Sequence, residues 1–133
     1  SGNKRPQLVV VQLLEFKALL EKEESADRSN VQKITDYDFD FHLLIAMASG
    51  NTVYPLLMNS FRPVYTNLSG QFFKDPDVTA AVHGYHREMV SAIEAKNKKK
   101  AGSVMKKMLQ HGEMHLRQMI DTENPAVSLP EGG

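Results

Sequence analysis

ITDYDFDFHLLI, residues 34–45, places apolar side chains at helical intervals and sets two polar side chains on the same stripe. Asp38 and His42 are four residues apart, so they lie one turn from each other on one face of the helix. That face also holds Phe41 and Ile45 and should point into a core. The segment therefore predicts a buried helix that carries a carboxylate and an imidazole inward.

The same helical spacing continues along the chain, and no stretch shows the clean alternation with period two that a half-buried strand requires. The predicted helices cover residues 7–22, 31–48, 54–72, 76–96 and 97–121, with a kink at Pro63 in the third. Short polar breaks separate them, and Asp75-Pro76-Asp77 is a helix-start signal. Five antiparallel helices with short connections predict an all-α helical bundle.

The composition is that of one soluble globular domain, and it excludes several classes of function. Sixteen basic and 16 acidic residues give a formal net charge of zero, which argues against holding nucleic acid through overall charge. The absence of cysteine rules out a disulfide scaffold, a thiol nucleophile and a thiolate metal site. No apolar run approaches the roughly 20 residues that span a bilayer. A metal site would have to use His, Asp and Glu.

The two ends of the chain differ from its middle. The opening residues Ser1-Gly2-Asn3 lack an initiator methionine, so residues 1–6 read as a cloning scar or linker. We expect one domain over residues 7–124 and a disordered tail over residues 125–133. The chain is thus expected to be a domain excised from a longer protein.

Further histidines lie on the apolar stripes of the later helices. His86 interrupts one such stripe, and His111 and His115 continue another. A buried aspartate costs several kcal/mol unless its charge is compensated, and neutral imidazoles with one carboxylate suit Zn, Ni, Fe or Mn. We predict a divalent transition metal held by Asp38, His42 and His86 with a further histidine of the last helix. The alternative is a hydrogen-bonded Asp–His pair beside unrelated core histidines.

The pattern around this cluster argues against catalysis. His83 is one turn before His86, but its face is expected to point toward solvent, so it is left out of the site. No glutamate is clearly placed beside the cluster as a general base. Metalloprotease, di-iron, Ser-His-Asp and phosphate-loop patterns are also missing. We predict that the chain is not an enzyme, with a metal-dependent enzyme as the least favoured alternative.

Two motifs resemble those of a bacterial regulator family. Residues 38–42, followed after six residues by Ser49-Gly50-Asn51, resemble a D-x-x-F-H … G-N signature. The run His86–Ile93, followed by Ala101, is similar to an H-x-x-i-x-x-A-i … A pattern. Both are typical of the FCD domain, the C-terminal effector-binding and dimerisation domain of FadR-type GntR transcription regulators. The resemblance covers roughly residues 7–119.

The resemblance implies a metal site built from one aspartate and three histidines. Asp38, His42 and His86 match three of these positions. The family's usual spacing after His86 reaches Met108, and His111 comes one turn later. Either His111 takes the fourth position through a small shift of its helix, or the site keeps three protein ligands. The resemblance also implies an FCD-like bundle that lacks most of the family's first helix.

The resemblance further implies a ligand-sensing function. Arg62 would meet the carboxylate of the ligand, Asn51 would be the family's helix-capping asparagine, and His115 is expected beside the ligand. The expected molecule is a cytoplasmic bacterial homodimer that binds a small organic acid at the metal. It would control operator DNA through an absent winged-helix domain, with no membrane partner. The alternative is a metal-free acyl-CoA sensor of the FadR type, in which the histidines are polar residues of the core.

Overall fold

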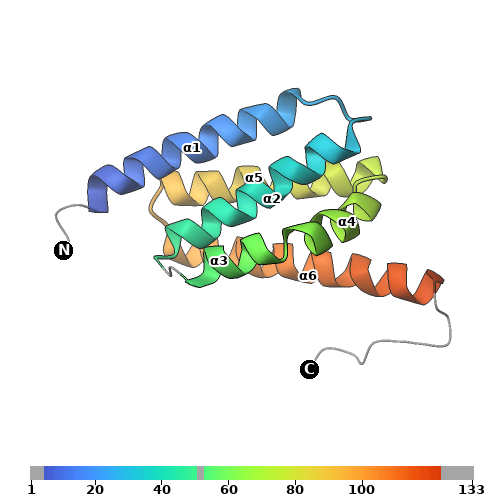
Figure 1. The fold of residues 1–133 in the computed structure, drawn as a ribbon. Coiled ribbons are helices and arrows are strands. Elements are labelled where there is room, and N and C mark those ends of the chain that lie inside the picture. Colours follow the sequence, from blue (N-terminus) through green and yellow to red (C-terminus); the bar gives the residue numbers. More distant parts are fainter. Residues whose placement is uncertain (1–4, 51–52, 124–133) are drawn as a thin grey trace.

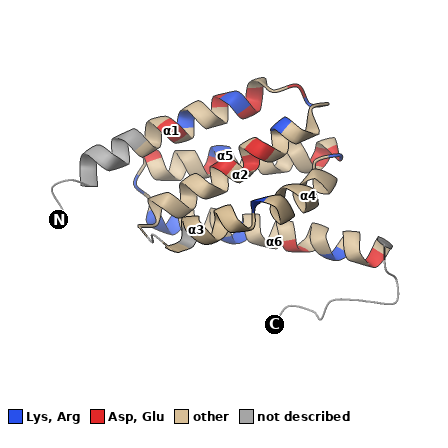
Figure 2. Cartoon of the chain, in the orientation of Figure 1, with Lys and Arg blue, Asp and Glu red and all other residues tan. Residues whose placement is uncertain are grey.

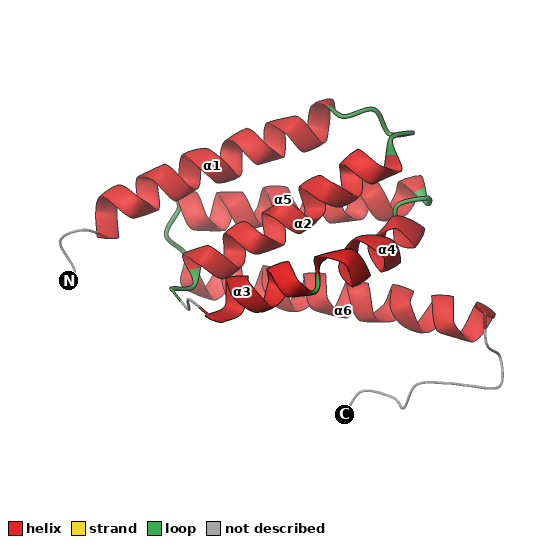
Figure 3. Cartoon of the chain, viewed as in Figure 1, coloured by secondary structure: helices red, strands yellow, loops and turns green. Residues whose placement is uncertain are grey.

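The computed structural model is a bundle of six helices, and the residues that it describes, 5–50 and 53–123, contain no strand (Figure 1 and Figure 3). The predicted all-α bundle is confirmed. No helix in these two ranges has the length and apolar character of a membrane span. The predicted tail, residues 125–133, lies outside the described residues. The helices are α1 (Arg5–Ser25), α2 (Val31–Ala48), α3 (Val53–Ser60), α4 (Arg62–Phe72), α5 (Pro76–Glu94) and α6 (Lys98–Glu123).

Local capping explains where the two central helices begin. The side chain of Asn30 accepts a hydrogen bond from the Lys33 amide at 3.1 Å and caps α2. The Asp75 carboxylate accepts from the Asp77 amide at 2.9 Å, and Pro76 occupies the first turn of α5. Gly50, at φ 81°, follows the end of α2 in the left-handed conformation that glycine adopts without strain. These caps fix the ends of α2 and the start of α5 where the sequence predicts them.

The third predicted helix, residues 54–72, is two helices rather than one kinked helix. Helix α3 ends at Ser60, and α4 begins at Arg62 with Pro63 in its first turn. Proline has no amide hydrogen, and its ring clashes with the carbonyl four residues earlier, so the hydrogen-bond ladder stops there. Proline is well suited to the first turn of a new helix, which is the position that Pro63 takes. The expected kink is therefore a break.

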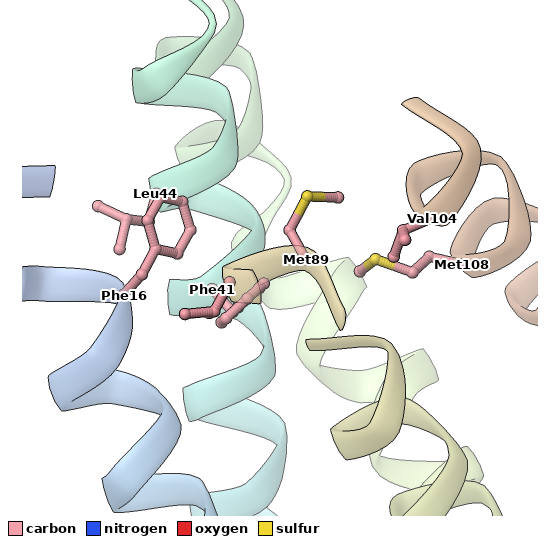
Figure 4. Packing of buried hydrophobic residues seen from close by; sticks show 7 residues of the cluster. Phe16, Phe41, Leu44, Met89, Val104 and Met108 are labelled. Carbon is pink, nitrogen blue, oxygen red and sulfur yellow. The ribbon is translucent and has the colours of Figure 1, made fainter. Parts of the chain in front are cut away.

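Helices α2 and α5 form the centre of the bundle (Figure 1). Helix α1 packs on both, α3 and α4 pack on α2, and α6 packs on α5. The rings of Phe16 and Phe41 meet edge to face at 5.3 Å, which joins α1 to α2. Apolar side chains of four helices complete this core: Phe16, Phe41, Leu44, Met89, Val90, Val104 and Met108 (Figure 4).

Charge is distributed unevenly over the helices. Residues of both signs are interspersed on α1, α2, α5 and α6 (Figure 2), whereas in the sequence Arg62 is the one charged residue of α3 and α4. Leu56 of α3, Val64 of α4 and Phe61 between the two helices are also exposed. The α3–α4 side of the bundle is therefore mainly apolar, which matters for the cavities that it helps to line.

Candidate metal and ligand site

Asp38, His42 and His86 meet in the interior of the bundle. One ligand atom from each of these residues lies within 4.8 Å of the other two. Nε2 of His86 is 3.3 Å from Oδ1 of Asp38, and Nε2 of His42 is 3.6 Å from the same oxygen. Helices α2 and α5 thus bring together the three residues that the sequence pattern grouped. Two imidazole nitrogens converge on one carboxylate oxygen.

Nε2 of His86 is a buried nitrogen without a hydrogen bond. It lies near Asp38, but the contact does not have the geometry of a hydrogen bond. Buried polar atoms are usually paired, so this exception needs an explanation. A divalent ion between the carboxylate and the two imidazoles would take the lone pair of this nitrogen in place of a proton and would compensate the charge of Asp38. Two imidazoles and one carboxylate are therefore a donor set that fits Zn, Ni, Fe or Mn.

Glu23 of α1 also belongs to this site, although the sequence pattern placed no glutamate there. Its side chain is 1% exposed, and its carboxylate oxygens lie 2.8 and 2.9 Å from Nδ1 of His86. In the tautomer whose Nδ1–H donates a hydrogen bond to Glu23, Nε2 carries the lone pair that can bind a metal. Glu23 follows Phe16 by seven residues on the inward face of α1, and that spacing is the signal that could have found it.

His83 is buried, so the expectation that it faces solvent is wrong. Its side chain is 2% exposed, and its Nδ1 has no hydrogen-bond partner. The reason is that α5 packs on both α1 and α6, which buries more of its surface than a single inward stripe. Burial, together with the nearby charge of Arg28, lowers the pKa of His83 to about 4. His83 is therefore neutral near pH 7, with its ring 6.4 Å from that of His86.

Tyr65 of α4 closes the site from the other side. Its hydroxyl donates a hydrogen bond to Oδ2 of Asp38. The ring lies edge-on to His42 at 6.0 Å and to Phe39 at 5.4 Å. Tyr65 therefore occupies one oxygen of Asp38, and the other oxygen faces the two imidazoles. This long-range contact was not predicted from the sequence.

Two cavities meet at this site. The first, of about 350 Å³, lies between α4, α5 and α6 and reaches Asp38 and His42. The second, of about 590 Å³, lies between α2, α3 and α6 and is lined mainly by apolar side chains. His42, Tyr65 and Leu109 line both cavities. Their sizes are within the range of small-molecule pockets. A ligand in either cavity could reach His42.

The remaining predicted site residues lie apart from Asp38, His42 and His86. His111 and His115 line the first cavity but are not in the group within 4.8 Å, so a fourth ligand from α6 stays a prediction. Arg62 lines neither cavity. Its Nη2 atom is 3.6 Å from Oδ1 of Asp40, and its guanidinium lies 4.6 Å from the centre of the Phe39 ring. The role of Arg62 toward a ligand also stays a prediction. Asn51 lies outside the described residues.

The charge of His86 should make the metal-free protein sensitive to pH. Burial alone would lower the pKa of His86, but the neighbouring carboxylates of Asp38 and Glu23 outweigh it and raise the pKa to about 9. This value exceeds the ordinary 6.5, so protonated His86 stabilises the fold fully below pH 6.5. That contribution is lost as the pH rises through about 9.

We therefore expect the melting temperature in chelator to fall between pH 6.5 and about 9. Scanning calorimetry across this range measures the effect. The fall should be much smaller in a His86→Gln variant, which has no proton to lose there. A parent protein whose melting temperature stays constant over this range would contradict the expectation.

Comparison with known proteins places the chain in a family. The profile of the FadR C-terminal domain matches residues 9–124. A fatty acid metabolism regulator protein of Shewanella sp. (strain MR-4) is 26% identical over 101 residues, 75% of this chain and 42% of the relative. A protein of the same name from Salmonella paratyphi B is 28% identical over 71 residues, 53% of this chain and 29% of the relative.

These matches cover only part of each relative. The chain spans less than half the length of these curated relatives. No solved structure gives a significant match. The family profile nevertheless runs from residue 9, within α1, to the end of α6, and this range includes both motifs that carry the resemblance. The chain belongs to the FadR C-terminal domain family.

Proposed function

We propose that the chain is the ligand-sensing domain of a bacterial transcription regulator, and that it binds a small carboxylate at a divalent metal held by Asp38, His42 and His86. The observation that carries this proposal is the buried, unpartnered Nε2 of His86 beside Asp38. Both cavities reach His42, so a ligand would lie next to the metal. When bound, the ion would supply a Lewis-acidic contact for a carboxylate oxygen.

The surrounding residues prepare the site and connect it to the bundle. Glu23 holds His86 by Nδ1 and thereby joins the site to α1. Tyr65 holds Asp38 and thereby joins the site to α4. A ligand that changes these two contacts would shift the balance between arrangements of α1 and α4. In the proposed regulator, such a shift in a homodimer alters operator binding by a separate winged-helix domain.

The alternative is a metal-free acyl-CoA sensor. The relatives named fatty acid metabolism regulators and the apolar second cavity favour a ligand with an acyl chain. The convergence of Asp38, His42 and His86 favours the metal-assisted carboxylate. Metal content separates the two proposals, because the acyl-CoA sensor would use these histidines as core residues.

Metal removal should lower the stability of the parent protein. An ion that binds only the folded state stabilises it by about 4 kcal/mol when its free concentration is about 1,000 times Kd. We expect protein purified without a His-tag column to contain a transition metal by elemental analysis. Its melting temperature should fall when chelator is added.

Two variants test which residues hold this ion. His42→Ala should reduce the chelator effect, whereas Asp40→Asn should retain it in full, because Asp40 pairs with Arg62 at the surface. Identical melting curves of the parent with and without chelator, together with no metal in the elemental analysis, would contradict the metal site.

A further inference from the structure

His111 and His115 form a second histidine cluster on α6, apart from Asp38, His42 and His86. They are four residues apart, so both rings lie on one face of the helix. Their Nε2 atoms are 3.1 Å apart. Tyr85 lies edge-on to His111 at 5.4 Å, and the Phe72 ring is 6.2 Å from His115. Aromatic contacts from α5 and α4 therefore support two imidazoles whose Nε2 atoms face each other.

The separation of these atoms fits two ligands of one metal ion. Imidazole nitrogens bind Zn²⁺ at about 2.0–2.1 Å, so two of them at about 90° to 109° lie roughly 2.9–3.4 Å apart. The observed 3.1 Å is within this range.

The pair is also open to further ligands. Both histidines line the first cavity, and so does Glu113, whose carboxylate is 2.9 Å from Nη2 of Arg117. Water or an acidic molecule in the cavity could complete the coordination of an ion there. Neither His111 nor His115 belongs to the described group within 4.8 Å that contains Asp38, so the two clusters are separate donor sets.

We propose that His111 and His115 chelate a second divalent ion of the Ni²⁺, Cu²⁺ or Zn²⁺ class on the wall of the first cavity. This assignment takes His111 away from the first site, where the sequence pattern offered it as a fourth ligand. It does not depend on the proposed function, because the histidine pair would bind its ion whether or not Asp38, His42 and His86 hold one.

Titration of Ni²⁺ alone into the chelator-treated, tag-free chain tests this proposal. By calorimetry the parent should bind about two molar equivalents, and His115→Ala and His42→Ala about one each. Gln118→Ala, an exposed position on the same helix, is the control and should behave as the parent does. The parent and His42→Ala could instead each bind one equivalent, with none bound by His115→Ala. That result would support the site at His111 and His115 and overturn the site at Asp38, His42 and His86.

Three results would overturn the second site. One is a single equivalent that His42→Ala removes and His115→Ala leaves in place. Another is a parent protein that binds one equivalent of Ni²⁺ that is lost in His42→Ala and also lost in His115→Ala, because both clusters would then hold the same ion. The third is a parent protein that binds no Ni²⁺, because the two rings would then only share a proton.

Discussion

Replacing His86 by alanine is expected to lower the unfolding free energy of the metal-free protein by about 3–5 kcal/mol. The imidazole lies between two buried carboxylates, those of Glu23 and Asp38, and it stacks on Phe41 with ring centroids 3.8 Å apart. Without it, both carboxylates stay buried without their shared cation, and a cavity opens beside Phe41. Urea unfolding in chelator at neutral pH measures the loss.

The next residue on α5 provides a matched control. Arg87 pairs with Glu24 at 3.4 Å, as His86 pairs with Glu23, but the Arg87 and Glu24 side chains are 53% and 45% exposed. Exposed ion pairs contribute little because water and salt screen them, so Arg87→Ala should cost less than about 1 kcal/mol. Equal losses for the two variants would show that the buried pair has no special role in stability.

Most of the fold follows from local signals in the sequence. Helical spacing, the polar breaks and the start signal at Asp75-Pro76-Asp77 are properties of neighbouring residues, and they predicted the bounds of α2 and the start of α5. Pro63 was harder, because a proline inside an apolar stripe can bend a helix or end it. Whether Pro63 bends or ends the helix depends on the backbone at Phe61, which leaves the helix before Arg62. The spacing of apolar residues carries no information on that backbone conformation.

The candidate site was predicted only where it is local. Asp38 and His42 share one turn of α2, so their spacing was sufficient to group them. Glu23 and Tyr65 were missed because their contacts join residues 63 and 27 positions apart. A helical stripe shows which face is buried but not which helix will cover it. The burial of His83 has the same cause, since two helices cover α5.

Arg62 illustrates the same limit for charged residues. The sequence shows an arginine beside apolar residues, which fits either a surface position or the mouth of a cavity. The structure pairs it with Asp40 and places it over Phe39, both on α2. This pairing depends on how α4 packs across α2, and no motif within either helix encodes it.

Removing the metal is expected to weaken carboxylate binding by at least about tenfold, because a lost contact to a charged group costs roughly 1.5–3 kcal/mol. Asp38, His42 and His86 would hold the ion beside both cavities, so the ligand's carboxylate should need it. The His42→Ala variant should show the same weakening in the presence of metal. Asp40→Asn should bind as the parent does, since its ion pair with Arg62 lies at the surface.

Calorimetric titration of small organic acids into metal-loaded and chelator-stripped protein is the most direct test of this metal-dependent recognition. Citrate-like and lactate-like acids are suitable probes, with a long-chain acyl-CoA titrated in parallel. We predict that at least one small acid binds the loaded protein and that stripping weakens it at least about tenfold. Equal affinity for the acids with and without metal would contradict this. So would tight acyl-CoA binding to the stripped protein when no small acid binds the loaded one.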